Sequence, residues 1–529
     1  MYTKGLPNFG RPFLIKLLMK KIIPFLLLAM LFNSFLLAQT TQDLVKKTMN
    51  EKQTVLVNEF KEFLSIPNVA ANPKGLQENA IWIMNYMKTK GIEDVSFLNL
   101  PNSSMPPVVY GEVKVPGATE TIIFYAHYDG QPVDTTKWFA SLHPFKPTLY
   151  DGLYEKGAAA LPWLSQGAYY DKNARIYARG ASDDKAGVMA IINAYAFLKN
   201  LNIAPTVNIK FFFEGEEEAG SPHLEQLLEL YKNKLAANFW IICDGPVHQS
   251  GKKQLVMGVR GDTHIELTVF GPKRPLHSGH YGNWVLNPAM ELVRLLASMK
   301  NEKGEVTIKG FYDDVTPLTK VEKQALAIVP SVEAQLKEEL GINATERTGA
   351  LNDALQLPSL NINGIESAGV GKYSANVIPT KAIASIDMRL VMGNDWERQQ
   401  QKVIDHIKSQ GFFVTDKDPT DEQRKLNPKI CKVVRDEKSY NAQKTSLDNP
   451  YVKRISNAIS LVTNEPPVLL PTLGGSLPLF VFEKVLHTSP VTVPIANHDN
   501  NQHAENENIK LKNFFEGIEL FASMMTLKN

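Results

Sequence analysis

The stretch TIIFYAHYDGQPVD, residues 121–134, decides the fold. In it, an apolar run is followed directly by polar side chains that can bind a metal or transfer a proton. Thr121–Ala126 is almost continuously apolar, which is typical of a strand covered on both faces of a sheet. Two similar runs follow at Val207–Phe213 and Asn238–Cys243, and Gly187–Leu198 has the pattern of a buried helix. Strands that alternate with helices predict an α/β fold around a mostly parallel sheet.

Outward from this core, the pattern changes after Gly258 and returns to the α/β type at Pro450. Thr263–Phe270 and Lys381–Leu390 alternate polar and apolar residues, as half-exposed and usually antiparallel strands do. A smaller α+β domain is therefore expected to be inserted into the α/β domain. The first part of the α/β domain is expected over 39–256, the inserted domain over 257–445, and the second part of the α/β domain over 446–529. Helices are expected over 41–98. The segment 301–360 is too irregular to assign.

Residues 1–38 form a separate N-terminal segment in which lysines precede an apolar run of about 11 residues, Ile22–Phe32. This is the pattern of a secretory signal peptide. The alternative, a membrane anchor, usually needs about 20 apolar residues. Translation starts at Met1 or Met19, and cleavage is expected near Ala38. The mature protein is therefore expected to be exported, periplasmic or secreted, with no stable membrane insertion.

The composition excludes several classes of protein. Of 529 residues, 44% are hydrophobic and 21% are charged, which argues against a disordered chain. The 57 basic and 55 acidic residues nearly balance, so no nucleic-acid partner is expected. Two cysteines exclude a disulfide scaffold and a four-cysteine zinc site. A metal site would have to use His, Asp and Glu.

Polar side chains follow each of the three predicted strands, and a further pair opens the predicted helix. His127 and Asp129 follow the first strand, Glu214–Glu218 contains four glutamates after the second, Asp244 follows the third, and Asp183–Asp184 precedes the helix. Each group alone also fits a helix cap or a solvated turn. Together they are expected to converge, because the carboxyl ends of parallel strands line one crevice. A crevice with so many carboxylates needs bound cations if the carboxylates are to stay ionised. Oxygen and imidazole ligands without thiolate suit zinc, manganese or cobalt.

These motifs resemble those of the dinuclear zinc peptidases that include carnosinase, the non-specific dipeptidases, carboxypeptidase G and succinyl-diaminopimelate desuccinylase, and the dipeptidase branch most closely. They occur in the family's order over nearly the whole mature chain. The matching strings are HYDGQPVD (127–134), RGASDDKAG (179–187), EGEEEAGS (214–221), CDG (243–245), LHSGHYGN (276–283), NVIP…IDMRLV (376–391), GGSLP (474–478) and HAENE (503–507). The resemblance implies a catalytic domain with an inserted ferredoxin-like domain that serves as lid and dimerisation domain, and hence a homodimer.

The resemblance also implies a site with two divalent metal ions, zinc first and manganese or cobalt as alternatives. Glu217 would be the general base for a water that bridges the metals, and Asp129 would orient the first histidine ligand. The Gly-Ser pair that follows selects Glu217 among three consecutive glutamates. The implied ligands are His127, Asp183 as the bridge, Glu218, Asp244 and His503.

Four further residues are implied to bind the substrate, and one to assist catalysis. His277 would polarise the scissile carbonyl across a dimer interface, and Arg389 would hold the substrate carboxylate with its planar fork. Asn376, Gly475 and Ser476 would complete the substrate site.

The expected function is hydrolysis of dipeptides or short peptides with a free C-terminal carboxylate. Two alternatives stay open: an N-acyl-amino-acid amidohydrolase of the same fold, and a non-catalytic peptide-binding relative. The chain departs from the family pattern at Ala186, which separates the lysine of Asp-Asp-Lys from its glycine, and at Asn376, where relatives carry threonine. The stretch 148–172 is longer than expected and is predicted to lie beside the crevice.

Overall fold

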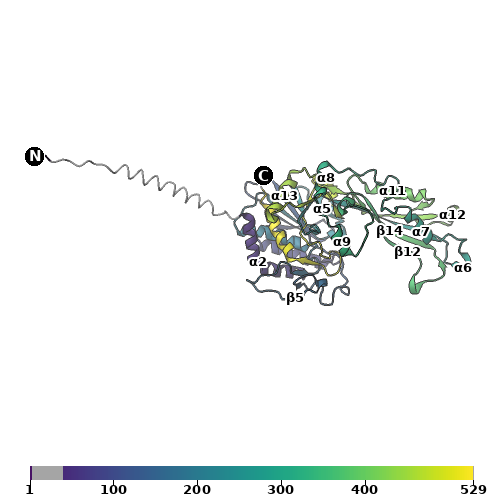
Figure 1. Ribbon diagram of the computed structural model, residues 1–529, viewed down its shortest axis with the longest axis horizontal. Helices are drawn as coiled ribbons and strands as arrows, with labels where there is room; N and C mark the ends of the chain where they lie inside the picture. The colour runs from purple at the N-terminus through teal and green to yellow at the C-terminus, as the bar shows by residue number, and fades with distance from the viewer. Residues whose placement is uncertain (3–39, 528–529) are drawn as a thin grey trace.

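The computed structural model shows an α/β body from which a smaller domain projects (Figure 1). It describes residues 1–2 and 40–527, so the predicted signal peptide lies outside the described residues. Among the helices of the described ranges, none has the length and hydropathy needed to cross a bilayer.

An eight-stranded mixed sheet forms the centre of the body. Its four middle strands run parallel: β7 (Asn208–Glu214), β3 (Thr121–His127), β8 (Phe239–Ile242) and β20 (Val491–Thr492). The other strands are β1 (Asp94–Leu98), β2 (Val108–Val113), β9 (Gln254–Val256) and β18 (Val468–Leu470). The flanking strands β2 and β9 join the middle group through antiparallel pairing, and the edge strands β1 and β18 pair with them antiparallel and parallel, respectively. The predicted parallel sheet is therefore present at the centre, where the site residues were expected.

Helices cover both faces of this sheet. One core joins residues 45–257 to residues 452–527, so the two ends of the chain build one body. The prediction of helices over 41–98 is correct for two segments and wrong for 94–98, which is strand β1 paired with β2. The helices of the body are α2 (Thr41–Leu64), α3 (Pro73–Thr89), α4 (Lys185–Asn200), α5 (Leu224–Leu230), α13 (Pro450–Thr463), α14 (Phe480–Leu486) and α15 (Leu511–Met525).

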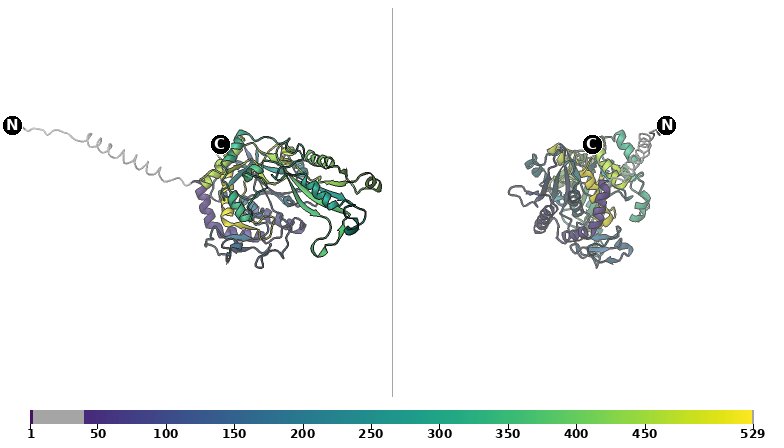
Figure 2. Two further views of the ribbon diagram at one scale, coloured as in Figure 1. Left: turned by 45° about the vertical axis from the view of Figure 1, so that its right-hand side comes forward. Right: turned by 90° about the vertical axis from the view of Figure 1, so that its left-hand side faces the viewer.

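The projecting domain, called the lid below, has its own core drawn from residues 265–433. Its sheet is antiparallel except at one edge, in the order β12-β14-β10-β16-β15. The long strand β10 starts in the body, where it pairs with β17 and β19, and continues into the lid. The left view of Figure 2 shows the lid projecting from the body. The bounds are β10 (Gly258–Phe270), β12 (Ser359–Glu366), β14 (Lys381–Leu390), β15 (Phe413–Thr415), β16 (Ile430–Arg435), β17 (Gln443–Lys444), β19 (Leu473–Ser476), α7 (Pro288–Ala297), α11 (Trp396–Ser409) and α12 (Asp421–Leu426).

Short elements fill the segment that the sequence left unassigned. They are the helices α8 (Lys320–Ala327), α9 (Glu333–Leu340) and α10 (Leu351–Ala354). At the tip of the lid, the two-stranded ladder of β11 (Leu276–His277) and β13 (Val377–Ile378) leads into the single turn α6 (Ser278–Tyr281).

The later part of the long stretch 148–172 packs on helix α2, whereas Glu155 accepts a hydrogen bond from Asn501 Nδ2, in the loop that carries His503, at 3.3 Å. The Asn58 side chain donates to Leu164 O at 3.4 Å, and Tyr170 N donates to Gln53 Oε1 at 2.8 Å. The stretch belongs to a four-stranded sheet of β4 (Thr148–Tyr150), β5 (Ala160–Leu161), β6 (Arg175–Tyr177) and β21 (Asn508–Lys510).

Candidate active site

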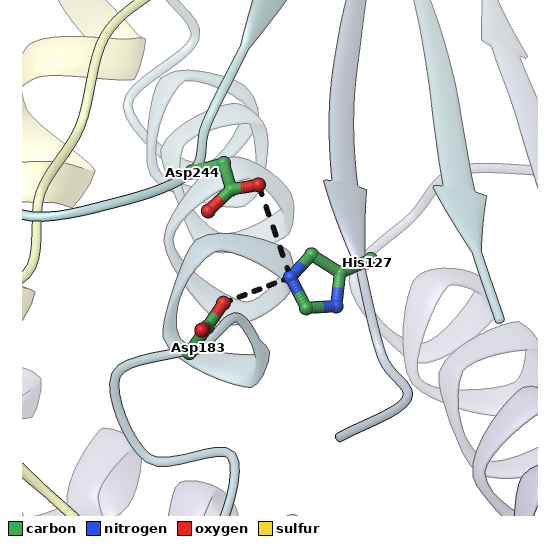
Figure 3. A group of neighbouring side chains, drawn as sticks. All are labelled: His127, Asp183 and Asp244. Carbon is green, nitrogen blue, oxygen red and sulfur yellow. Dashed lines mark hydrogen bonds and ion pairs between the residues drawn. The ribbon is translucent and has the colours of Figure 1, made fainter. Parts of the chain in front are cut away.

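The ends of two central strands and the start of α4 bring three predicted ligands together (Figure 3). His127 is the last residue of β3, Asp244 lies two residues after β8, and Asp183 lies in the turn before α4. His127 Nε2 is 2.9 Å from Asp183 Oδ1 and 4.0 Å from Asp244 Oδ2. All three side chains are buried, and their donor atoms lie within 4.8 Å of one another, close enough to hold one ion.

Asp183 also belongs to a second group, with Glu218 and His503. His503 Nε2 is 3.1 Å from Asp183 Oδ2 and 3.3 Å from Glu218 Oε2. Asp183 thus directs Oδ1 toward the first group and Oδ2 toward the second, as a bridging ligand requires. The structure brings all five predicted ligands together, and two donor sets of imidazole and carboxylate without thiolate fit zinc, manganese or cobalt.

The crowding of carboxylates shifts the pKa values of these side chains. Burial and the neighbouring Asp183 raise the pKa of Glu218 to about 8 and that of Asp244 to about 7. Burial alone would also raise the pKa of Asp183, but hydrogen bonds with His127 and His503 outweigh it and lower that pKa. The hydrogen bond to Asp183 raises the pKa of His503 to about 9. Such a cluster is electrostatically suited to divalent cations.

Asp129 lies behind the ligands and fixes the turn that follows β7. Its two oxygens accept the backbone N–H groups of Glu217 at 3.1 Å and Glu218 at 3.0 Å. Asp129 Oδ1 also lies 3.4 Å from His127 Nδ1, on the side of the ring opposite the ligand group. This placement suits the predicted role of orienting the imidazole.

Glu217 faces the ligand cluster, whereas its neighbour Glu216 does not. Glu217 Oε2 is 3.8 Å from His127 Nε2, and burial raises the pKa of Glu217. A raised pKa suits a group that must take up and release a proton near neutral pH. Glu216 instead accepts His223 N at 3.0 Å and contacts the His223 ring. The geometry therefore agrees with the register that selected Glu217.

A cleft of about 820 Å³ extends from the ligands to the base of the lid. Arg389 and Gly475 line it together with Glu217. Arg389 Nε donates to Asp387 Oδ2 at 3.2 Å, and Arg389 Nη1 lies 3.4 Å from Asp262 Oδ2. The backbone of Ser476 ends β19 and is paired with Arg260 on β10.

The structure does not bring His277 and Asn376 into this cleft. His277 pairs with Val377 on the β11–β13 ladder, and Asn376 directly precedes β13. Ser278 N donates to Asn376 O at 3.0 Å. Both are exposed, and α6 lies at the end of the lid that is farthest from the body (Figure 1). Within one chain, these two predicted site residues are remote from the metal ligands.

Sequence reasoning missed Glu507, a fully buried carboxylate that holds the turn of Asp183. Glu507 Oε1 accepts the N–H groups of Ser182 at 2.9 Å and Asp183 at 3.1 Å. Glu507 Oε2 accepts Gly180 N at 2.9 Å and pairs with Arg179 at 2.8 Å. The sequence did offer a signal, because Glu507 stands in the HAENE motif, which also contains the candidate ligand His503.

Gln131 is a second missed residue. Its side-chain amide donates to Glu218 Oε2 at 2.6 Å, so it holds one oxygen of a candidate ligand from the cleft side. It stands in the HYDGQPVD motif, four residues after His127.

Residues 123–527 match the sequence model of peptidase family M20/M25/M40. The chain belongs to this peptidase family. This confirms the resemblance, the fold class and the enzyme class, a metal-dependent peptidase, that were predicted from the motifs.

Several M20 peptidases are similar to the chain over most of its length. The Cys-Gly metallodipeptidase of Schizosaccharomyces pombe is 27% identical, over 91% of this chain and 97% of its own length. Human Beta-Ala-His dipeptidase is 28% identical, over 79% of this chain and 77% of its own. The crystal structure of an M20 family metallo-carboxypeptidase from Sulfolobus solfataricus has a TM-score of 0.72 and 28% identity, covering 89% of this chain and 98% of its own.

Proposed function

We propose that this M20 peptidase is a dinuclear metal-dependent dipeptidase that hydrolyses dipeptides or short peptides with a free C-terminal carboxylate. The observation that carries the proposal is one cleft that holds three things: two donor groups sharing Asp183, the free carboxylate of Glu217, and the guanidinium of Arg389. The names of the relatives, Cys-Gly metallodipeptidase and Beta-Ala-His dipeptidase, support dipeptides as the substrate class.

The residues of the cleft divide the reaction between them. Metal ions, zinc first and manganese or cobalt as alternatives, would supply an activated water and polarise the carbonyl when bound by His127, Asp183, Glu218, Asp244 and His503. Glu217 takes the proton of the attacking water and gives it to the leaving amine nitrogen. Arg389 binds the substrate carboxylate through its fork of N–H donors, within the frame that Asp262 and Asp387 provide. The backbone at Gly475 and Ser476 borders the same substrate.

The proposal includes a homodimer in which each cleft is completed by the second chain. His277 and Asn376 lie outside the cleft of their own chain, at the exposed tip of the lid. In the homodimer, the partner subunit's His277 would enter the cleft and stabilise the oxyanion. Exposed apolar side chains nearby support burial against another chain. They are Trp284, Met290, Val293 and Ile365.

Domain boundaries and location are proposed as the sequence predicts them. The separate cores of the body and the lid support an inserted domain over 257–445 between catalytic parts at 39–256 and 446–529.

The apolar segment Ile22–Phe32 supports export to the periplasm or the medium. Cell fractionation followed by N-terminal sequencing would test this, with a mature end near Gln39 expected.

A substrate panel on purified, metal-loaded protein tests the function. The panel contains matched dipeptides, dipeptide amides and N-acyl amino acids, and released products are separated by chromatography. Fast hydrolysis of dipeptides with little turnover of the other two classes is expected. Preference for N-acyl amino acids would favour a deacylase instead. Two bound metals without turnover of any class would favour a peptide-binding relative.

A further inference from the structure

A second cavity, of about 300 Å³, lies beside the catalytic cleft. It is formed largely by the segment 301–360, for which the sequence predicted no structure. Leu336, Leu340 and Ile342 line one part of it, and Leu351 and Leu355 line both this cavity and the cleft. Its volume is at the lower end of the range for small-molecule sites, and its walls are mostly apolar.

A buried cation lines this cavity. Arg260 is 5% exposed, and its Nη2 donates to Leu357 O at 2.9 Å and Ser359 Oγ at 3.0 Å. Arg260 Nε has no hydrogen-bond partner, and in residues 40–527 no carboxylate lies within ion-pair distance of this guanidinium. Burial and the neighbouring Arg389 lower the pKa of Arg260 to about 10, which leaves it protonated at neutral pH. Asp262 and Asp387 offset part of this charge from beyond ion-pair distance. A buried cation with no anion in direct contact is costly, so an anion here would be stabilising.

The other charged side chains around the cavity also favour an anionic ligand. Lys300 is paired with Glu346 at 2.6 Å. Glu333 is engaged by Ser331 Oγ and by Leu351 N. Lys337 and Arg347 also line the cavity, and neither has a carboxylate partner within the described part of the chain. Basic groups therefore exceed acidic ones at this site.

We propose that this cavity binds a small apolar monocarboxylate, separately from the peptide substrate. The carboxylate would accept hydrogen bonds from Arg260, and the hydrocarbon body would lie against Leu336, Leu340 and Ile342. A charged head meets a guanidinium with no carboxylate in contact, and an apolar tail fits the aliphatic walls. Neither feature is used by the peptidase reaction proposed above.

Calorimetric titration of the metal-loaded protein with four probes tests the chemistry of the ligand. Octanoate is expected to bind saturably, with one site per chain beyond any in the catalytic cleft. Octanol has the same body without the charge and is expected to bind about 10-fold more weakly or worse, the scale of a charge-assisted hydrogen bond. Octylammonium and acetate are expected not to bind. Equal affinity for octanoate and octanol, or no saturable binding of octanoate, would overturn the proposal.

Four variants then locate the site. Arg260→Met should weaken octanoate binding by about 10-fold or more, and Ala354→Trp should block it by filling the cavity. Ala354→Trp leaves the guanidinium in place, so it decides the matter if Arg260→Met fails to fold. Gln335→Ala, on α9 but away from the lining, is the matched control and should bind normally. Arg389→Met should also bind normally. Loss of binding in Arg389→Met alone would place octanoate in the catalytic cleft and refute the second site.

Discussion

The cluster of candidate metal ligands and the tip of the lid hold their predicted site residues in opposite ways. His127 and Asp183 are buried. Glu507 holds the turn of Asp183, and Asp129 holds the turn of Glu217 and Glu218, each by accepting backbone N–H groups. His277, by contrast, is exposed on a two-residue strand, and its ring accepts one local N–H, that of Gly279. One part of the proposed machinery is preorganised within a single chain, and the other part would reach a substrate only in the proposed homodimer.

Removal of divalent metal should have the largest effect and should separate the two regions. Peptide hydrolysis is expected to be abolished by chelation and restored by zinc, manganese or cobalt, because the five candidate ligands converge on the cleft. Metal content of variants sharpens the comparison. His127→Ala should lose bound metal, whereas His277→Ala should keep about two ions per chain. Full turnover in protein shown to be metal-free would contradict the proposed function.

Glu217→Gln should lower turnover by about 10² or more while metal content stays normal, since the amide cannot take up a proton. Glu216→Gln is the matched control, because Glu216 bonds to His223 and faces away from the cluster. Metal analysis and steady-state kinetics on both variants give the answer. A greater loss in the Glu216 variant would mean that the general base has been assigned to the wrong glutamate.

Arg389→Met should reduce kcat/KM on dipeptides by about 10- to 150-fold, the value of a bidentate charge-assisted contact. Arg389→Lys should recover part of the loss, because lysine lacks the planar fork. Dipeptide amides, which have no carboxylate, should be poor substrates for the wild type and nearly insensitive to either change. An equal loss on acids and amides would assign Arg389 a structural role in its network with Asp262 and Asp387.

The smallest effect is expected on the stability of the protein, when the Arg175–Asp499 ion pair at the base of the loop that carries His503 is removed. Although burial opposes it, the hydrogen bond and charge of Arg175 lower the pKa of Asp499 to about 2. A lowered pKa in the folded state stabilises the protein above the unfolded pKa of about 3.9, and this stability is lost as the pH falls toward 2. Urea unfolding at pH 6 and pH 3 should therefore show a gap between wild type and Arg175→Met that narrows at the lower pH. A constant gap would show that Arg175 acts through packing.

Local patterns predicted that the polar groups at the strand ends converge, and the family resemblance chose the ligands among them. Each ligand group of the α/β core follows an apolar strand or opens a helix, and the geometry of a parallel sheet then brings strand ends together. The family resemblance added His503, which no strand pattern indicated. Residues 94–98 were assigned wrongly because DVSFL has no clear period over five residues, and pairing with β2 decides its conformation.

Contacts between distant parts of the chain could not be predicted in the same way. Glu507 holds the turn of Asp183 from 324 residues away, and Arg260 is buried beneath Ser359 and Leu357. Nothing in the local sequence around these residues specifies their partners. The segment 301–360 has short helices with few buried residues, so hydrophobic periodicity carries little information there.

The comparison between the two regions is tested most directly by subunit complementation. Glu217→Gln and His277→Ala chains, each nearly inactive alone, would be mixed, and heterodimers purified by two different affinity tags. One of the two clefts would then contain an intact Glu217 together with the partner subunit's His277. We predict recovery to about half of the wild-type activity per dimer, the share of one cleft in two. No recovery in verified heterodimers would contradict the account, because His277 would then act in its own chain or not at all.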